Sequence, residues 1–167
     1  MRPGATGALP FDTMPDEEAR ALLRGCLDVD RWVEEVLAGR PYGDRVALVR
    51  TADLAARSLT AAELDAALAG HPRIGERAGA GHNQQASGRE QAGVDSADTD
   101  LATRLASGNA AYEQRFDRVF LIRAAGRDGE EILAELQRRL GNDDDAERAE
   151  VVDNLRQIAL LRLEEAV

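Results

Sequence analysis

The sequence predicts an all-α protein, folded as a single-domain bundle of about seven or eight helices. Alanine, leucine, arginine and glutamate dominate the composition, whereas aromatic residues make up only 4% of it. These dominant side chains lose little freedom on a helical backbone. Apolar residues recur at helical intervals along much of the chain, and no segment shows the two-residue alternation of a β-strand. Together these observations favour a helical bundle over any mixed fold.

The 167 residues are enough for one domain with a proper core. Residues 1–10 are rich in glycine and proline and are expected to form a flexible N-terminus, so the helical domain should span residues 11–167. The formal net charge of −10 disfavours binding to nucleic acid or to an anionic membrane. The chain shows neither a signal peptide nor an apolar stretch of about 20 residues, so we expect a cytoplasmic protein.

The N-terminal half contains start and stop signals for four helices. Proline and acids at residues 15–18 open the first helix. Asp30 is expected to cap a second helix that ends near Gly39. Residues 45–58 form a third helical stretch, with its apolar marks at Val46, Val49 and Leu54. Thr60 and Glu63 form a capping box for a fourth helix, which carries Leu64, Ala67 and Leu68.

The fourth helix must stop at Gly70-His71-Pro72. Glycine suits a left-handed helix end, and the residue before proline is pushed out of the α region. His71 is therefore expected in an extended bend between a helix and a loop. The following residues 73–85 are rich in glycine and polar side chains, and loops of this length are uncommon in compact domains unless they are functional or mobile.

The C-terminal half predicts three further helices. From Asp98 onwards apolar residues recur at helical intervals, and Gly126 is expected to end this helix. Its apolar positions are Leu101, Leu105, Tyr112, Phe116, Val119 and Phe120. Asp128 or Gly129 starts the next helix, which Gly141 closes. Residues 143–145 offer a cap for the last helix, with Val152, Leu155, Ile158 and Ala159 on one face.

Candidate metal and nucleophile sites are few. The only histidines are His71 and His82, and their spacing fits no helical zinc pair. The single cysteine, Cys26, cannot form an internal disulfide. It lies among leucines and is expected to be a small core residue. We therefore expect no bound metal.

His71 is the candidate for acid–base chemistry, because Gly70 and Pro72 constrain its backbone on both sides. A histidine held in this way can present one ring nitrogen at a defined point, as proton transfer near neutral pH requires. The plainer alternative is a histidine that only bonds across a loop. From spacing alone that structural role is favoured, since most histidines are not catalytic.

Glu90 allows two interpretations of the same local pattern. Ser87 and Glu90 form a second capping box, in which Glu90 would bond the Ser87 backbone N–H and serve only the helix start. A helix N-terminus is also suited to holding an anion or a polar ring. Ser87 and Gln91 would then contact a substrate while Glu90 orients the substrate or the histidine. The local pattern leaves both interpretations open, and capping is the safer one.

Several motifs, in order, resemble the 2-oxo-4-hydroxy-4-carboxy-5-ureidoimidazoline (OHCU) decarboxylase family. They are HPRIGE at residues 71–76, SGREQAG at 87–93, NAAYEQRF at 109–116, VFLIRAAGR at 119–127, EIL at 131–133 and IALLRL at 158–163. Each motif is short, but their joint order and spacing are specific. The resemblance extends from Phe11 to Leu163. One departure is Asp117, where many members carry glycine after the Arg-Phe pair.

The resemblance implies an all-helical, cofactor-free carbon–carbon lyase of urate and purine breakdown. This family converts OHCU to S-allantoin and carbon dioxide, and it suggests a homodimer. By resemblance His71 is the catalytic acid, Pro72 shapes the pocket, and Ser87, Glu90 and Gln91 contact the substrate. The backbone of the segment Leu121, Ile122, Arg123, Ala124 and Ala125 lines the opposite wall. An arginine also assists, and both Arg123 and Arg127 lie near the expected place.

Two other interpretations remain, one of them another enzyme and the other a protein of a different functional class. The chain could be a related small-molecule decarboxylase or hydrolase on the same scaffold, or a catalytically silent helical interaction module. The histidine, the Ser-x-x-Glu-Gln segment and the Asn-x-x-Tyr segment favour an enzyme over the silent module. The proposed partner is thus a small ureidoimidazoline, with neither nucleic acid nor membrane.

Overall fold

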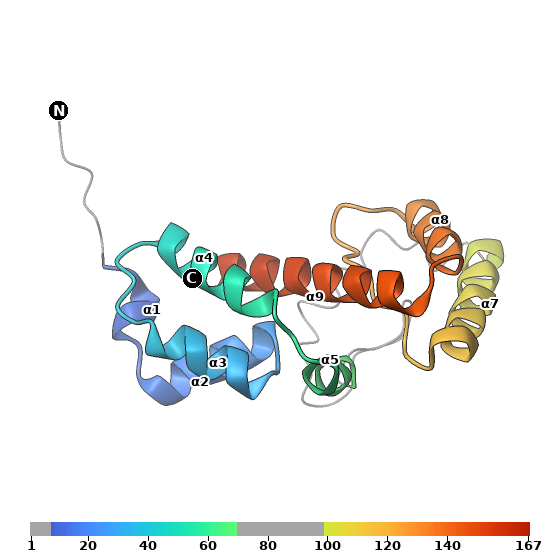
Figure 1. Ribbon diagram of the computed structural model, residues 1–167. Helices are drawn as coiled ribbons and strands as arrows, with labels where there is room; N and C mark the ends of the chain where they lie inside the picture. The colour runs from blue at the N-terminus through green and yellow to red at the C-terminus, as the bar shows by residue number, and fades with distance from the viewer. Residues whose placement is uncertain (1–7, 70–98) are drawn as a thin grey trace. The chain divides into compact units, whose positions relative to one another are not determined.

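The computed structural model describes residues 8–69 and 99–167, and within these ranges every regular element is a helix. The helices, labelled as in Figure 1, are α1 (Pro10–Thr13), α2 (Asp16–Cys26), α3 (Asp30–Ala38), α4 (Arg45–Ala56), α5 (Ala61–Leu68), α7 (Thr99–Phe116), α8 (Gly129–Arg139) and α9 (Asp144–Ala166). The predicted all-α class is confirmed. None of the described helices combines the length and apolar character needed to cross a bilayer.

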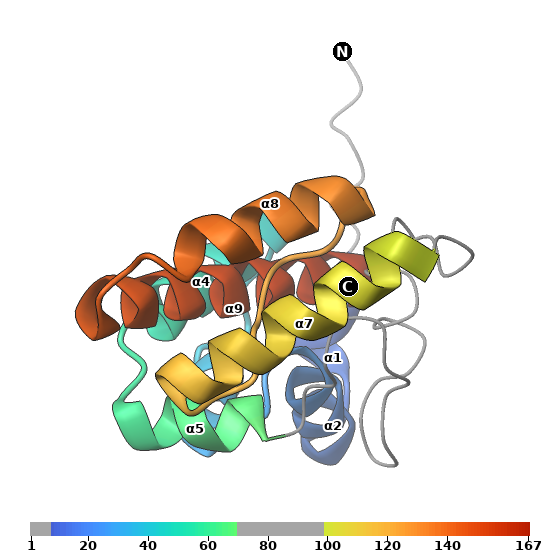
Figure 2. The same cartoon turned by 90° about the vertical axis from the view of Figure 1, so that its right-hand side faces the viewer.

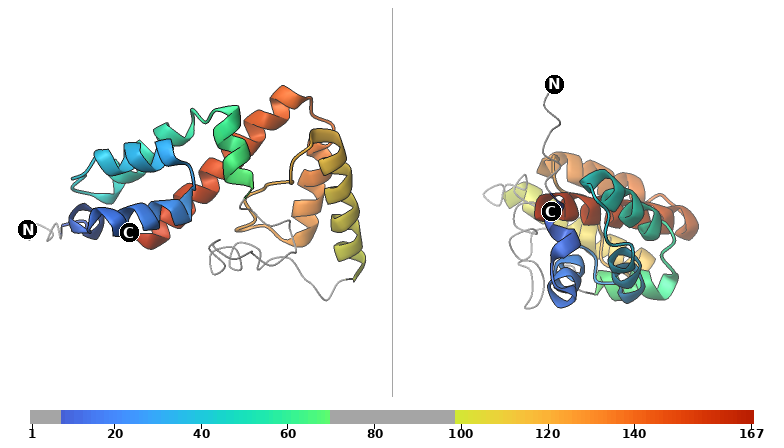
Figure 3. Two further views of the ribbon diagram at one scale, coloured as in Figure 1. Left: turned by 90° about the horizontal axis from the view of Figure 1, so that it is seen from below. Right: turned by 90° about the vertical axis from the view of Figure 1, so that its left-hand side faces the viewer.

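The chain divides into two compact units, one of residues 1–63 with 156–167 and one of residues 64–155. In the first unit α3 packs between α2 and α4, as Figures 1 and 3 show. Trp32 of α3 is fully buried, and its indole N–H donates to the Ala52 carbonyl at 2.9 Å. Cys26 is buried as expected, and burial raises the pKa of its thiol to about 12.

One local expectation in this unit is wrong, and one helix was not expected. Asp30 does not cap α3: it is the first helical residue, Val29 occupies the cap, and the Asp30 carboxylate pairs with Arg24 at 2.7 Å. The short helix α1, which begins at Pro10, is the one that was not expected.

The buried face of α4 also differs from the one expected. Val46 and Leu54 are 68% and 62% exposed, whereas Leu48 is buried together with three alanines, Ala52, Ala55 and Ala56. The large apolar side chains do not mark the buried face of α4, because small alanines allow a neighbouring backbone or ring to approach closely. The indole bond to the Ala52 carbonyl is one such approach.

The helix that leads toward His71 begins as predicted. The Thr60 N–H donates to Glu63 at 2.9 Å, and the Glu63 N–H donates to the Thr60 hydroxyl at 3.1 Å, so the capping box is formed. Arg31 of α3 reinforces this start, since its Nε donates to Glu63 at 2.8 Å. Leu64, Ala67 and Leu68 are buried. The start of α5 is therefore fixed from two sides.

In the second unit α7 and α8 lie side by side and run in the same direction (Figure 2). Two close approaches establish this arrangement. A Cβ on Gly129 would lie 2.4 Å from Leu101, and a Cβ on Gly108 would lie 2.5 Å from Leu136. The two pairs follow the same order along both helices, so the helices are parallel. Residues 117–128 must consequently run back along them.

The expected length of the α7 helix is wrong. Gly126 does not end it: the helix stops at Phe116, and Asp117 adopts a φ of 55°. Phe120 lies beyond the end of the helix but is still buried, because its ring packs edge-on against the Tyr112 ring, with centroids 5.1 Å apart. A helical period thus extends into a segment that is not helical.

The caps of the last two helices agree with the sequence. Asp128 accepts the Glu131 N–H at 2.8 Å at the start of α8, and Asp143 accepts the Ala146 N–H at 2.8 Å before α9. Of the four apolar residues expected on one face of α9, Leu155, Ile158 and Ala159 are buried and Val152 is partly exposed.

Candidate functional site

The candidate site residues fall into two groups. His71, Pro72, Ser87, Glu90 and Gln91, together with the loop of residues 73–85, lie outside the described residues. The remaining six lie in the segment of residues 117–128 that connects α7 to α8, which we call the wall segment. They are Leu121, Ile122, Arg123, Ala124, Ala125 and Arg127.

The backbone of the wall segment is held from one side by two buried or partly buried side chains. Arg139, the last residue of α8, donates from Nη1 to the Leu121 carbonyl at 2.7 Å. Asn154 of α9 accepts the Arg123 N–H at 3.0 Å. Asn154 is itself oriented, because its amide donates to the Glu150 carbonyl at 2.8 Å. Side chains from two helices thus fix a non-helical segment.

The spacing of these two contacts indicates in which direction the backbone groups of the residue between them face. Bonds to residues i and i+2 from one side are typical of an extended chain, in which the peptide groups of the intervening residue face the other way. That residue is Ile122. Among the described residues, none forms a hydrogen bond with the Ile122 N–H or C=O. The backbone therefore offers a donor and an acceptor on the side away from Arg139 and Asn154.

A turn closes the wall segment before α8. The Arg127 N–H donates to the Ala124 carbonyl at 3.1 Å, and Gly126 takes a φ of 79° that favours glycine. The Arg127 guanidinium donates from Nε to the Arg123 carbonyl at 3.1 Å. Arg127 thus supports the turn directly.

Arg123 differs from Arg127 in the state of its guanidinium. Its Nε is buried and has no hydrogen-bond partner among the described residues. A buried N–H donor without an acceptor is costly and rare, so such a group is often completed by a ligand or a water molecule. Arg123 is half-buried as a whole. Of the two arginines, it is the one whose Nε is available to bond a ligand, since the Arg127 Nε already donates to a backbone carbonyl.

A buried ionic network supports the wall segment, and it was not among the features predicted from the sequence. Arg139 and Glu147 are both fully buried and form an ion pair. Tyr112 is also fully buried, and its hydroxyl donates to Glu147 at 2.6 Å. Burial raises the pKa of the Tyr112 phenol above its ordinary value, and the Glu147 hydrogen bond raises it further, so the phenol stays a donor.

The sequence carries little signal for this network. Arg139 lies in the last turn of α8, and Glu147 lies in the first turn of α9. Charges of these signs at these helix ends are ordinary, since they interact favourably with the helix dipole. Only the tertiary arrangement distinguishes the pair from surface charges.

Comparisons with known proteins agree on one family. The family model described as OHCU decarboxylase matches residues 12–164. A protein of Amia calva named 2-oxo-4-hydroxy-4-carboxy-5-ureidoimidazoline decarboxylase is 31% identical over 135 residues, which cover 79% of this chain and 77% of that protein. The family match includes the whole wall segment.

Two solved structures share the fold. A crystal structure of an OHCU decarboxylase in the presence of (S)-allantoin matches with a TM-score of 0.72 at 20% identity, over 91% of this chain and 97% of that one. A crystal structure of an (S)-allantoin synthase matches with a TM-score of 0.69 at 17% identity, over 94% of this chain and 52% of that one. Because the family model spans nearly the whole chain and the curated relative exceeds 30% identity, this chain belongs to the OHCU decarboxylase family.

Proposed function

We propose that this protein decarboxylates OHCU to S-allantoin and carbon dioxide without a cofactor, with His71 as the proton donor. Family membership supports the reaction, and a solved relative of the same fold was crystallised in the presence of (S)-allantoin. The structural observation that carries the proposal is the wall segment. Its backbone is anchored from one side and presents the Ile122 N–H and C=O on the other, which suits a ring bearing amide-like groups.

The reaction requires one bond to break and one to form. The bond between the ring carbon and its carboxylate breaks, carbon dioxide leaves, and the electron pair is delocalised onto the adjacent carbonyl or imine of the substrate. Protonated His71 then delivers its proton to one face of that carbon and regains a proton from water. Delivery from a fixed side chain yields one enantiomer. General acid catalysis of this kind contributes about 10²- to 10⁴-fold in rate.

The other site residues have roles in binding. Glu90 orients His71 or the substrate, Pro72 shapes the pocket, and Ser87 and Gln91 contact the substrate. On the opposite wall, the backbone of residues 121–125 binds the ring. The guanidinium of Arg123 binds a substrate oxygen, a role supported by its buried Nε, which has no partner among the described residues.

The role of His71 is tested by product chirality and rate with freshly generated OHCU. We expect His71→Ala to lose most of the rate acceleration and to yield allantoin close to the racemic mixture of the uncatalysed reaction. His82→Ala is the matched control, because it removes the chain's other histidine, and it should retain both properties. An alanine variant at position 71 that still made pure S product at the full rate would contradict the role.

Glu90 requires a separate test because capping and catalysis predict different losses. If Glu90 orients the reacting groups, Glu90→Gln should lose activity far beyond any loss of thermal stability, since glutamine still fits a capping box. Parallel losses of activity and stability would instead show that the residue serves only the helix start. The two readouts are kcat/KM for OHCU and the midpoint of thermal unfolding.

The same assays separate the remaining alternatives. A silent interaction module would leave the decay and the chirality of OHCU unchanged. A related decarboxylase or hydrolase would also leave the rate of OHCU decay unchanged, but it would act on another ureido acid or imidazolone in a substrate screen.

We further propose that the protein forms a homodimer, as the family resemblance implies, and that it is located in the cytoplasm. Light scattering coupled to size exclusion should give twice the 18.0 kDa mass of one chain. A mass of one chain at all concentrations would contradict the dimer.

A further inference from the structure

Arg139 makes contacts in two directions from a fully buried position. On one side its Nε donates to Glu147 at 2.9 Å, and its Nη2 donates to the same carboxylate. On the other side its Nη1 donates to the Leu121 carbonyl at 2.7 Å. The guanidinium also lies over the Phe120 ring, 4.6 Å from the centroid. One rigid side chain therefore connects a buried carboxylate to the wall segment.

The carboxylate that orients Arg139 is itself held in place. Glu147 accepts the Tyr112 hydroxyl at 2.6 Å through the same oxygen that faces Arg139, and it accepts the Asn142 amide at 3.1 Å through the other. Tyr112 comes from α7, Arg139 from α8 and Glu147 from α9. Three different helices thus supply one member each, so the position of the guanidinium is determined by all three.

Stability alone does not account for this arrangement. A buried ion pair is often replaced by well-packed apolar side chains without loss of stability, because both charges must be desolvated. What apolar side chains cannot replace is a donor directed at the Leu121 carbonyl. The planar guanidinium bonds a carboxylate and a second acceptor at fixed angles, whereas a lysine ammonium is a flexible point charge.

We propose that Arg139 is a positioning residue for the active site, which fixes the Leu121 carbonyl and through it the substrate-binding backbone of residues 121–125. Glu147 and Tyr112 hold Arg139 in the orientation that this contact requires. The inference rests on the proposed function in one respect only, namely that residues 121–125 bind the substrate.

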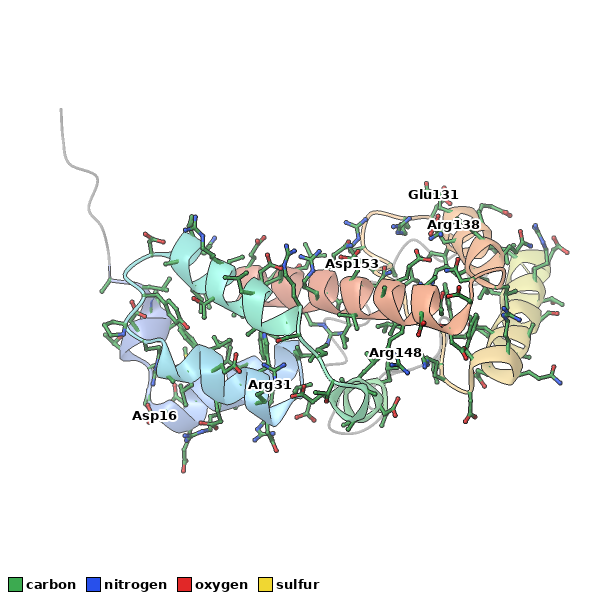
Figure 4. All side chains as sticks on the ribbon, viewed as in Figure 1. Asp16, Arg31, Glu131, Arg138, Arg148 and Asp153 are labelled. Carbon is green, nitrogen blue, oxygen red and sulfur yellow. The ribbon has the colours of Figure 1, made fainter. Side chains whose placement is uncertain are left out.

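The experiment compares Arg139→Lys with Arg138→Lys. Arg138 is the matched control: it is adjacent in α8 and also pairs with carboxylates, those of Glu135 and Glu150, but its side chain is half-exposed (Figure 4). No hydrogen bond joins its side chain to the described residues of the wall segment. Because Arg139→Lys could lower stability, a triple variant is added. It combines Tyr112→Phe, Arg139→Met and Glu147→Leu, and so removes the network without leaving a buried charge unpaired.

Two readouts are measured on the full chain. The first is hydrogen exchange of the backbone amides of residues 119–126, of which the Arg123 amide is directly hydrogen-bonded to Asn154. The second is the steady-state kinetics with fresh OHCU. We expect faster exchange confined to these amides in both Arg139 variants, and a fall in kcat/KM of about 10- to 100-fold, mostly through KM. Arg138→Lys should match the wild type in both.

The two readouts distinguish the possible failures. Exchange and KM that equal those of Arg138→Lys would overturn the positioning role. If the wild type itself does not act on OHCU, the proposed function fails, and exchange alone then decides whether Arg139 fixes the segment. A triple variant that is folded, with unchanged exchange at residues 119–126, would show that the network is structural only.

Discussion

Asp117 is the residue at which α7 ends, and its φ of 55° lies in the left-handed region that favours glycine. We predict that Asp117→Gly stabilises the protein by up to about 1 kcal/mol. The left-handed cost of about 1–2 kcal/mol for a side chain is partly offset by the greater freedom of glycine in the unfolded chain. Urea unfolding measures the change. A loss of stability would show that the Asp117 side chain makes a contact that outweighs its backbone strain.

Arg123 and Arg127 lie on the same turn but should respond differently to mutation. Arg123→Met removes a guanidinium whose buried Nε has no partner among the described residues, so we expect a higher KM for OHCU at nearly unchanged stability. Arg127→Met removes the bond to the Arg123 carbonyl and should lower stability by about 1 kcal/mol, with a smaller effect on KM. Kinetics and thermal unfolding of the two variants check both statements. The reverse pattern would assign substrate binding to Arg127.

At single residues the sequence offers candidates for catalysis, which stay predictions, but it offers none for the side chains that support the site. His71 and Glu90 are identifiable from motifs, because a constrained histidine and a Ser-x-x-Glu pattern are local features. Arg139 and Glu147 carry no such local signature, since their charges are ordinary for the helix ends at which they lie. Their burial and their contact with Leu121 depend on tertiary packing.

Among the described helices, three of the expected starts are confirmed, whereas the expected cap at Asp30 is wrong. The caps at Thr60, Asp128 and Asp143 all form, because each needs only a side chain and a backbone N–H three residues apart. Two other features require tertiary information. The buried face of α4 is set by alanines that pack closely, and α7 stops at Phe116 although apolar residues continue at a helical period.

The contact between α7 and α8 depends on Gly108. A Cβ at this position would lie 2.5 Å from the Leu136 side chain. We predict that Gly108→Ala destabilises the protein by about 1–2 kcal/mol, because overpacking outweighs the gain in helix propensity. Ser107→Ala, at the exposed neighbouring position, should be neutral or stabilising. Urea denaturation compares them, and equal effects of the two alanines would contradict the close approach.

The charged residues are unevenly distributed along the chain. The chain carries a net charge of −10, yet the wall segment contains three arginines, Arg118, Arg123 and Arg127, against two acids, Asp117 and Asp128. A substrate with a carboxylate is repelled by the average surface and requires such a local cation. An acidic protein can thus bind an anion at one basic site.

The all-α class was predicted correctly from composition and period, and the family from the order of short motifs. The arrangement that supports the site was not predictable in the same way. Parallel α7 and α8 require residues 117–128 to run back along them, and the sequence shows neither the direction of α8 nor the end of α7. The wall segment is a consequence of both.

The proposed function assigns the decarboxylation of OHCU to this chain. The most direct measurement is the circular dichroism of allantoin formed from freshly generated OHCU, with and without catalytic amounts of the protein. We predict faster formation of S-allantoin in its presence, against racemic product in its absence, because solvent protonates both faces of the free intermediate. Racemic allantoin formed at the same rate in both samples would contradict the claim.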